Sequence, residues 1–312
     1  MFSTKPQEVS DATSDFIIAL VPITFIASFV FGFKALLVLA TCMIGAAAGE
    51  VFARKMKGEK ATLDDGRALL IGLLLALTLP TTAWWAVIPL YTIGGFLATA
   101  LFRELMGARG LYRFNPVLLA WLFLFIGRTA FIYLAPLPAD TVSTATPLFM
   151  SADQGLSVLR NSSIFLVYMG GALGETSVIA LLLGAAYLLY KGHISLYIPV
   201  SILGAVFFLT AVLGQDPLFH VLVGGVILGA FFIATDWITS PVTAKGKVIF
   251  GVGIGILTIL FRLYAAQYWV PVGGVAFSIL IMNAFVPAIE RSAGRINIGG
   301  MKRTQRETGH TG

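Results

Sequence analysis

The sequence predicts an all-α polytopic membrane protein with about ten transmembrane helices, and three observations carry this prediction. Only 12% of the 312 residues are charged and 58% are hydrophobic, whereas soluble domains carry roughly 25% charged residues. Apolar runs close to the roughly 20 residues that a membrane helix needs recur along the chain, separated by short polar clusters. Residues 1–15 are polar and end in no small-residue cleavage site, so the first apolar run is expected to remain as a helix.

The apolar runs fall into two groups of five, with a long polar segment between the groups. The expected helices cover residues 16–32, 34–53, 67–80, 84–103 and 115–134, and then 164–190, 194–213, 218–237, 248–264 and 271–289. The third run is short and ends at Pro80, and the sixth contains Gly170, Gly171, Gly174 and Glu175, which suits a broken or tilted helix. Interrupted helices at matching places in two halves often mark a ligand site.

The two groups of helices are expected to be inverted repeats. Residues 71–76 resemble residues 224–229, and each stretch follows a polar entry. Five helices per half force the second repeat to cross the membrane in the opposite sense. The expected parts of the chain are a cytoplasmic N-terminus (1–15), a first repeat (16–134), an extracytoplasmic loop (135–163), a second repeat (164–290) and a basic cytoplasmic tail (291–312).

Lysine and arginine residues predict the orientation. With both termini in the cytoplasm, 17 of the 21 basic residues fall in cytoplasmic segments, as the positive-inside rule requires. The outer side keeps Lys34, Arg128, Arg160 and Arg262. The net charge of +6 is therefore explained by topology, and no nucleic-acid partner is expected.

Metal and thiol chemistry are not expected, and no metal site is predicted. The single cysteine, Cys42, lies in an apolar run, and an iron–sulfur cluster needs about four ligands. Cys42 is either a small buried apolar residue or one ligand of a set shared with a partner protein. The three histidines, His193, His220 and His310, are scattered, and no P-loop, dinucleotide-binding or zinc-protease motif is present.

The segment Asp140-x-x-Ser143-x-Ala145-Thr146-Pro147 is a hydroxyl-rich interruption in this apolar chain. Pro147 restricts Thr146 to an extended backbone, which projects its side chain, and Ala145 leaves room for a bulky group. The alternative is a solvated turn whose Ser and Thr hydroxyls bond to their own backbone. The residues alone leave both interpretations open.

Other polar residues near apolar runs are further candidates for function. Glu175, followed by Thr176, lies within the sixth run, and Asp236 lies at the end of the eighth; each is a candidate for an ion path, a cofactor contact or a helix-end cap. Arg128, in the fifth run, could reach the membrane interface or stabilise an anionic cofactor. The last candidates are three basic residues of one predicted cytoplasmic loop, Arg103, Arg109 and Arg113. They either determine the membrane topology or bind the phosphate of a cofactor or an acidic partner.

Five motifs in order resemble a known family. They are Asp65-Gly66-Arg67 with Leu79-Pro80; Phe114-Asn115-Pro116; the Asp140–Leu148 segment; Gly171-x-x-Gly174-Glu175-Thr176-Ser177; and Leu228–Asp236, followed by Gly246-Lys247. Together they resemble the D subunits of Rnf complexes, which are ion-pumping ferredoxin:NAD oxidoreductases. They are similar, more distantly, to the B subunit of the Na⁺-translocating NADH:quinone reductase. The resemblance covers about residues 15–290.

The resemblance implies a covalent FMN on Thr146, held through a phosphoester bond. It also implies a flavin transferase that recognises Asp140 and Ser143, and five partner proteins in the plasma (inner) membrane, the A, B, C, E and G subunits of the complex. A non-covalent riboflavin is known for the quinone-reductase relative, and the sequence does not place its contacts here. Thr144 stands where the motif often has Gly, and the loop before Phe114 departs from the family pattern through Ala108 and Tyr112.

The resemblance makes a redox subunit of an ion pump the expected function. Two alternatives remain: a small-solute channel or transporter, since inverted five-helix repeats also build such proteins, and a non-redox membrane scaffold. The sequence does not distinguish Na⁺ from H⁺ as the transported ion.

Overall fold

A computed structural model describes residues 6–59, 63, 65–80, 84–107, 113–134, 172–265 and 274–293, and all their regular secondary structure is helical. Four helices in these ranges are long and apolar enough to cross a membrane: Ser10–Phe31, Phe33–Met56, Ala244–Tyr264 and Gly274–Ser292. Shorter apolar helices lie between them. The predicted all-α membrane fold is therefore confirmed.

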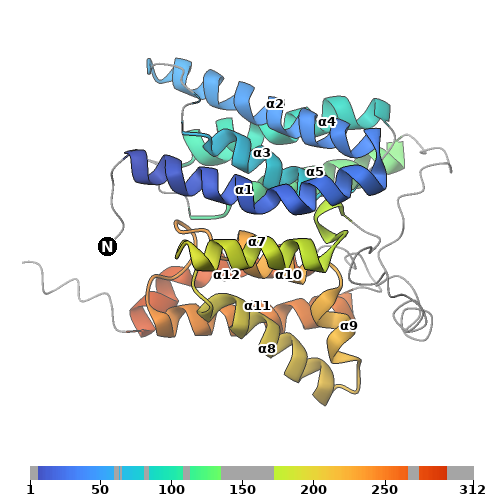
Figure 1. Ribbon diagram of the computed structural model, residues 1–312, viewed down its shortest axis with the longest axis vertical. Helices are drawn as coiled ribbons and strands as arrows, with labels where there is room; N and C mark the ends of the chain where they lie inside the picture. Colours follow the sequence, from blue (N-terminus) through green and yellow to red (C-terminus); the bar gives the residue numbers. More distant parts are fainter. Residues whose placement is uncertain are drawn as a thin grey trace, which may run out of the picture.

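The helices run roughly side by side in one bundle, with the first half of the chain stacked on the second (Figure 1). The first half contains α1 (Pro6–Phe31), α2 (Phe33–Met56), α3 (Arg67–Leu77), α4 (Trp84–Leu97) with the π-helix η1 (Ala98–Leu105), and α5 (Pro116–Leu134). The second half contains the 3₁₀ turn η4 (Leu173–Glu175), α7 (Val178–Tyr190), α8 (Tyr197–Val212), α9 (Pro217–Leu222), α10 (Val226–Leu228) with the π-helix η5 (Gly229–Ile233), α11 (Ala244–Leu260) with the π-helix η6 (Phe261–Ala265), and α12 (Gly274–Ser292).

One end of the bundle gathers basic residues, and we call it the basic end. Arg54, Lys57 and Arg103 lie there near the end of α2 and the end of η1, and Lys191 and Lys247 lie there in the second half. The start of α1 and the end of α12 are at this same end (Figure 1). The described chain ends therefore share one side of the bundle.

Three predicted boundaries are wrong or need refinement. The first helix begins at Pro6 and not at residue 16. The continuous helix expected over 218–237 is absent, because α9 ends at Leu222 and α10 begins only at Val226. The polypeptide is continuous here and only the helix is interrupted; we call this interruption, residues 223–225, the chain break. Gly224 and Gly225 in this break adopt φ angles of 69° and 71°, which favour glycine and interrupt a helix. Residues 164–171 of the sixth run lie outside the described part; from Ala172 on, the run is interrupted as expected, because the 3₁₀ turn η4 precedes the regular helix that begins at Val178.

The two halves share features that agree with the predicted inverted repeats. The short helix α3 follows Gly66 with φ 65°, and α10 follows Gly225 with φ 71°. The fourth helix of each half, α4 or α11, ends in a π-helix. The directions are opposite: α3 begins at the basic end, whereas η5 ends near Asp236, which lines a cavity at that end.

Glycines allow the closest helix contacts in both halves. A Cβ atom on Gly184 in α7 would overlap the backbone carbonyl of Ala19 in α1, and one on Gly45 in α2 would overlap that of Thr92 in α4. Backbone cannot yield as a flexible side chain can, so α1 lies against α7 only because residue 184 lacks a side chain.

We expect Gly184→Ala to lower the stability of the protein by about 1–3 kcal/mol or more, because the added methyl forces α1 and α7 apart. The midpoint of SDS-induced unfolding of the purified complex measures this loss. Gly204→Ala is the matched control, because a Cβ at Gly204 in α8 has no atom within 4 Å. Equal midpoints for the two variants would contradict the packing argument.

Candidate functional site

The hydroxyl-rich loop lies outside the residues that the structure describes. Asp140, Ser143, Ala145 and Thr146 all fall within residues 135–171. The backbone of Arg128 is helical and lies in the last two turns of α5. On either side of this segment, α5 ends and α7 begins at the bundle end opposite the basic end (Figure 1).

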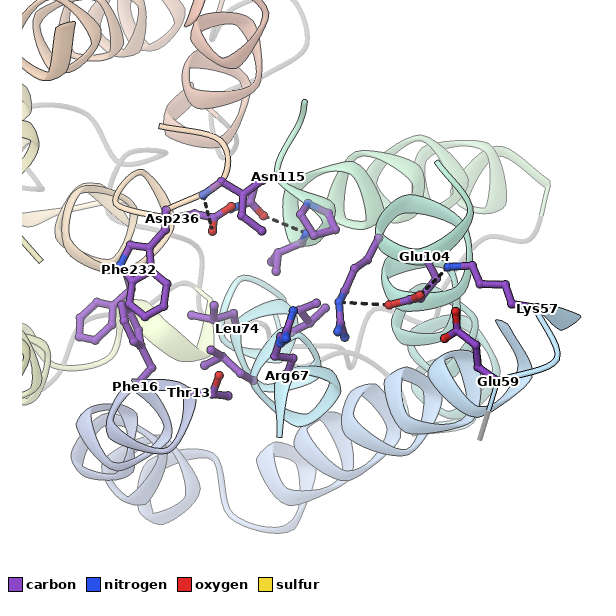
Figure 2. A pocket seen from close by; sticks show the side chains of 17 residues that line it. Thr13, Phe16, Lys57, Glu59, Arg67, Leu74, Glu104, Asn115, Phe232 and Asp236 are labelled. Carbon is purple, nitrogen blue, oxygen red and sulfur yellow. Dashed lines mark hydrogen bonds and ion pairs between the residues drawn. The ribbon is translucent and has the colours of Figure 1, made fainter. Parts of the chain in front are cut away.

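A large cavity of about 340 Å³ opens at the basic end, between the two halves. We call it the basic-end cavity, and Figure 2 shows it with aromatic side chains on one side and charged side chains on the other. Its volume lies within the range of roughly 300–1,000 Å³ typical of small-molecule sites. The lining residues are Thr13, Phe16, Lys57, Glu59, Arg67, Leu70, Ile71, Leu74, Arg103, Glu104, Asn115, Pro116, Val117, Phe232, Asp236, Trp237 and Ile238.

The aromatic wall is held in place by hydrogen bonds and ring contacts. The indole N–H of Trp237 donates to the backbone carbonyl of His193 at 3.0 Å. Phe16 meets Trp237 edge-on, with ring centroids 5.8 Å apart. Because both rings are fixed from behind, the wall offers a rigid apolar surface to a flat ligand.

Asp15 fastens α1 to the end of α7 behind that wall. Its carboxylate accepts from the Tyr187 hydroxyl at 2.5 Å and lies 2.7 Å from Nε2 of His193. The Lys191 ammonium is 3.4 Å from the same carboxylate. The hydrogen bond to Asp15 and the negative charge of Asp15 raise the pKa of Lys191. The side chains of α1 and α7 are thereby joined across the two halves of the chain.

The charged wall is an ion-pair network around a fully buried carboxylate. Glu50 in α2 pairs with Arg103 in η1 at 3.1 Å and with Arg54 one turn away. Asp65 extends the network to Arg67 at 3.0 Å and to Arg103 at 3.7 Å. Buried charges are tolerated when they are paired in this way. Glu50 was not among the residues predicted from sequence, although a carboxylate within an apolar run is a usable signal.

Asp236 lies in the turn after η5, where it lines the basic-end cavity (Figure 2). Its carboxylate accepts from the Thr239 hydroxyl at 3.0 Å and, more weakly, from the backbone N–H of Ile238 at 3.5 Å. It therefore caps the turn, as the simpler interpretation predicted, and it also faces a cavity. Asn115 lines the same cavity, and its side-chain amide donates to the backbone carbonyl of Ile233 at 3.4 Å.

Glu175 lines a different cavity of about 40 Å³, at the chain break before α10. We call it the break cavity. Its Oε1 lies so close to Gly225 that a Cβ there would sit 3.0 Å away, and its Oε2 is buried with no hydrogen-bond partner among the described residues. The Thr176 hydroxyl is engaged with the backbone carbonyl of Leu173 at 2.5 Å. Glu175 and Asp236 thus belong to two cavities, and the structure does not bring them into one site.

The remaining candidates have structural roles in the described part of the chain. Arg103 is buried in the ion-pair network, and Arg113 donates to the backbone carbonyl of Ala284 at 3.1 Å. Arg109 lies outside the described residues. Cys42 is fully buried in α2. Within the described ranges, no group of three or more His, Cys, Asp or Glu side chains could hold a metal ion.

Arg262, which the sequence placed among the basic residues of the outer side, is a buried side chain. It is only 7% exposed, and its guanidinium donates to the backbone carbonyls of His220, Val223 and Gly224 at 2.6–3.0 Å. These carbonyls belong to the chain break, so Arg262 holds the break together. The role of this residue was not visible in the sequence, because it depends on contacts with residues about 40 positions away.

Comparison with known proteins agrees with the resemblance seen in the motifs. The chain is 40% identical over 285 residues to the D subunit of the Na⁺-translocating ferredoxin:NAD⁺ oxidoreductase complex of Acetobacterium woodii, covering 88% of this chain and 86% of that protein. It is 38% identical over 307 residues to the proton-translocating counterpart of Clostridium ljungdahlii, covering 90% and 89%. The D subunit of the ion-translocating oxidoreductase complex of Methanosarcina acetivorans is 35% identical over 276 residues, covering 88% and 86%. Residues 1–299 match the family described as NQR2, RnfD, RnfE, and the chain belongs to that family.

Proposed function

We propose that this chain is the membrane-embedded D subunit of an Rnf-type complex, which couples ferredoxin:NAD oxidoreduction to Na⁺ or H⁺ translocation. The observation that carries the proposal is the similarity, at 35–40% identity over most of the chain, to subunits of such complexes. The all-α membrane fold supports it. The expected partners are the A, B, C, E and G subunits of the complex and the lipid membrane.

We further propose that Thr146 carries FMN through a phosphoester bond, attached by a flavin transferase. The support is the Asp140-x-x-Ser143-x-Ala145-Thr146-Pro147 motif and the family membership. A flavin supplies one-electron transfer, and a covalent tether prevents its dissociation from a loop that lacks a nucleotide-binding fold. Arg128 precedes this segment on α5 and would favour an anionic reduced flavin if its charge lies near the ring.

Flavin fluorescence of the denatured protein tests this function. After SDS electrophoresis of the complex, the band of this chain should fluoresce, because a covalent flavin survives denaturation. A small-solute channel or a non-redox scaffold would give a dark band. A dark band from a complex that has been matured with its flavin transferase would contradict the proposal.

The basic-end cavity suits a second, non-covalent flavin such as riboflavin. Trp237 and Phe16 supply an aromatic surface for a flat ring system, and Asn115 and Asp236 supply polar groups for hydroxyls. Arg67 and Arg103 lie on the opposite wall, where their guanidinium groups are paired with Asp65 and Glu50 and could donate further hydrogen bonds to a ligand. In this proposal Asp236 serves the flavin or the ion path at the basic end.

Trp237→Ala should release the non-covalent flavin, because it removes the ring that closes one wall of the cavity and its bond to His193. Loss of stacking at about 1–3 kcal/mol corresponds to roughly 5- to 150-fold weaker retention. Acid precipitation of the complex, followed by chromatography of the released flavin, measures the content per complex. Trp237→Phe keeps an aromatic face and should retain most of it. Equal flavin in all three proteins would place the flavin elsewhere.

We propose that both termini face the cytoplasm and that residues 135–163 face outward, as the distribution of basic residues suggests. In a Cys42→Ala background, Asp153→Cys should react with a membrane-impermeant thiol reagent added to intact cells. A cysteine replacing exposed Lys55 at the basic end should react only in inverted vesicles. The reverse pattern would overturn the orientation.

A further inference from the structure

The break cavity contains a carboxylate that the rest of the structure does not explain. The Glu175 Oε2 atom is shielded from solvent and has no hydrogen-bond partner among the described residues. Its Oε1 atom lies against Gly225, whose φ of 71° and missing side chain make room for it. An ionised carboxylate needs donors for both oxygens when it is buried. The geometry therefore suits a neutral carboxylic acid whose O–H bonds to water in the cavity.

Arg262 supplies the positive charge that acts on Glu175. Its guanidinium donates to the backbone carbonyls of His220, Val223 and Gly224, and the next residue, Gly225, lies against Oε1 of Glu175. These carbonyls end the short helix α9 and carry partial negative charge. The guanidinium is thus stabilised by backbone, and it acts on Glu175 from a distance.

The corresponding arginine in the first half of the chain, Arg103, forms a direct ion pair with a buried carboxylate. Arg103 lies on the π-helix that ends α4, as Arg262 lies on the π-helix that ends α11. Arg103 pairs directly with the buried Glu50 at 3.1 Å, so both charges of that pair are satisfied. Glu175 has no such partner among the described residues, and it remains able to gain and lose a proton.

The groups around Glu175 favour a proton over a metal cation. A hard cation needs several oxygen ligands, but the three backbone carbonyls at the break are already occupied by Arg262. The cavity of about 40 Å³ has room for a few water molecules, since roughly 10–15 Å³ of such volume is needed for one.

No other charged side chain faces the break cavity from the described elements around it. Its walls from α3, α5 and α12 are formed by apolar side chains and Thr78. Behind Arg262 lie His220, which is buried in α9, and Asp216, whose carboxylate caps α9 by accepting from the backbone N–H of Phe219. Glu175 and Arg262 are therefore the pair that decides the charge of the cavity.

We propose that Glu175 is a proton-binding site of the ion-translocating machinery, with Arg262 as its built-in counter-cation, and that Na⁺ does not bind there. The carboxylate takes up one proton that arrives as hydronium through the cavity, leaving water, and later gives the proton back to water as hydronium; no electron moves at Glu175. The proposal rests on the proposed ion-translocating function only for the use made of this proton.

Infrared spectroscopy of the oxidised, purified complex tests the proton site directly. The carbonyl stretching band of a protonated carboxylic acid, identified by its shift in D₂O, should disappear in Glu175→Gln. In the wild-type protein the band should be unchanged when choline chloride is replaced by NaCl at equal ionic strength. A band that survives in Glu175→Gln, or one that Na⁺ suppresses in the wild-type protein, would overturn the proposal.

Arg262→Gln tests the role of the counter-cation. It frees backbone carbonyls for a metal ion, so Na⁺ should now weaken the Glu175 band, whereas Arg262→Lys should behave as the wild-type protein does. An Arg262→Gln band indifferent to Na⁺ would show that the guanidinium does not exclude the ion. The same spectra from a Thr146→Ala complex test whether the proton site depends on the covalent flavin. The band of protonated Glu175 should persist in the oxidised complex when the flavin on Thr146 is missing.

Discussion

Thr146→Ala should remove all covalently bound flavin from this protein. The phosphoester needs a hydroxyl on residue 146, and alanine has none, so the expected loss is complete and not graded. The residue lies in a polar segment between the two halves, so the helical bundle should still assemble. In-gel fluorescence of the denatured complex, with the chain detected by antibody in the same lane, measures both outcomes.

Two further variants, one at the neighbouring Thr144 and one at Thr146 itself, provide the matched controls. Thr144→Ala should keep the flavin, because residue 144 is not the attachment site in the family motif. Thr146→Ser keeps a hydroxyl and should retain some covalent flavin if the transferase accepts it. Persistent fluorescence in Thr146→Ala together with its loss in Thr144→Ala would move the attachment to Thr144.

Glu50→Ala should have the largest effect on stability among the described residues. It removes the closest carboxylate of Arg103, which is only 5% exposed, and of Arg54, and leaves them the more distant carboxylates of Asp65 and Glu104 at 3.5–3.7 Å. Removing one member of a buried pair typically costs about 3–5 kcal/mol, because a buried charge then loses its main compensation. SDS-induced unfolding of the complex should show this as a large shift of the midpoint.

Replacing both Glu50 and its partner Arg103 tests whether the lost stability comes from an uncompensated charge. The Glu50→Leu/Arg103→Leu double variant removes both charges and should recover much of the stability lost in Glu50→Ala. Lys57→Ala is the control for an exposed pair, since Lys57 is 34% exposed and its bond to Glu104 should contribute about 0–1 kcal/mol. A double variant less stable than Glu50→Ala would show that the charges do more than neutralise one another.

The fold class was predictable because a high share of apolar residues and a low share of charged residues are typical of membrane-spanning proteins. Long apolar runs with few charges have few alternatives to spanning helices, and the described structure is helical throughout. The break at Gly224 and Gly225 was not predictable in the same way. Hydropathy continues smoothly across 218–237, and only the positive φ angles of the two glycines interrupt the helix.

The site was less predictable, because its contacts join distant residues. Glu50 and Arg103 are 53 positions apart, and counting Arg103 as a topology-setting charge concealed the pair. Arg262 was assigned to the outer side by the same count, which did not reveal that its side chain is buried at the chain break. Glu175 and Asp236 were both singled out from sequence, but only the structure separates them into two cavities. Thr146 was identified through the family resemblance, and its role stays a prediction.

Mass spectrometry of one peptide tests the covalent flavin most directly. Trypsin cleaves after Arg128 and Arg160, and no lysine or arginine lies between them, so residues 129–160 form a single peptide that contains Thr146. From the matured complex, this peptide should carry the added mass of FMN less one water, and fragmentation should place that mass on Thr146. An unmodified peptide, or a flavin mass on another residue, would contradict the assignment.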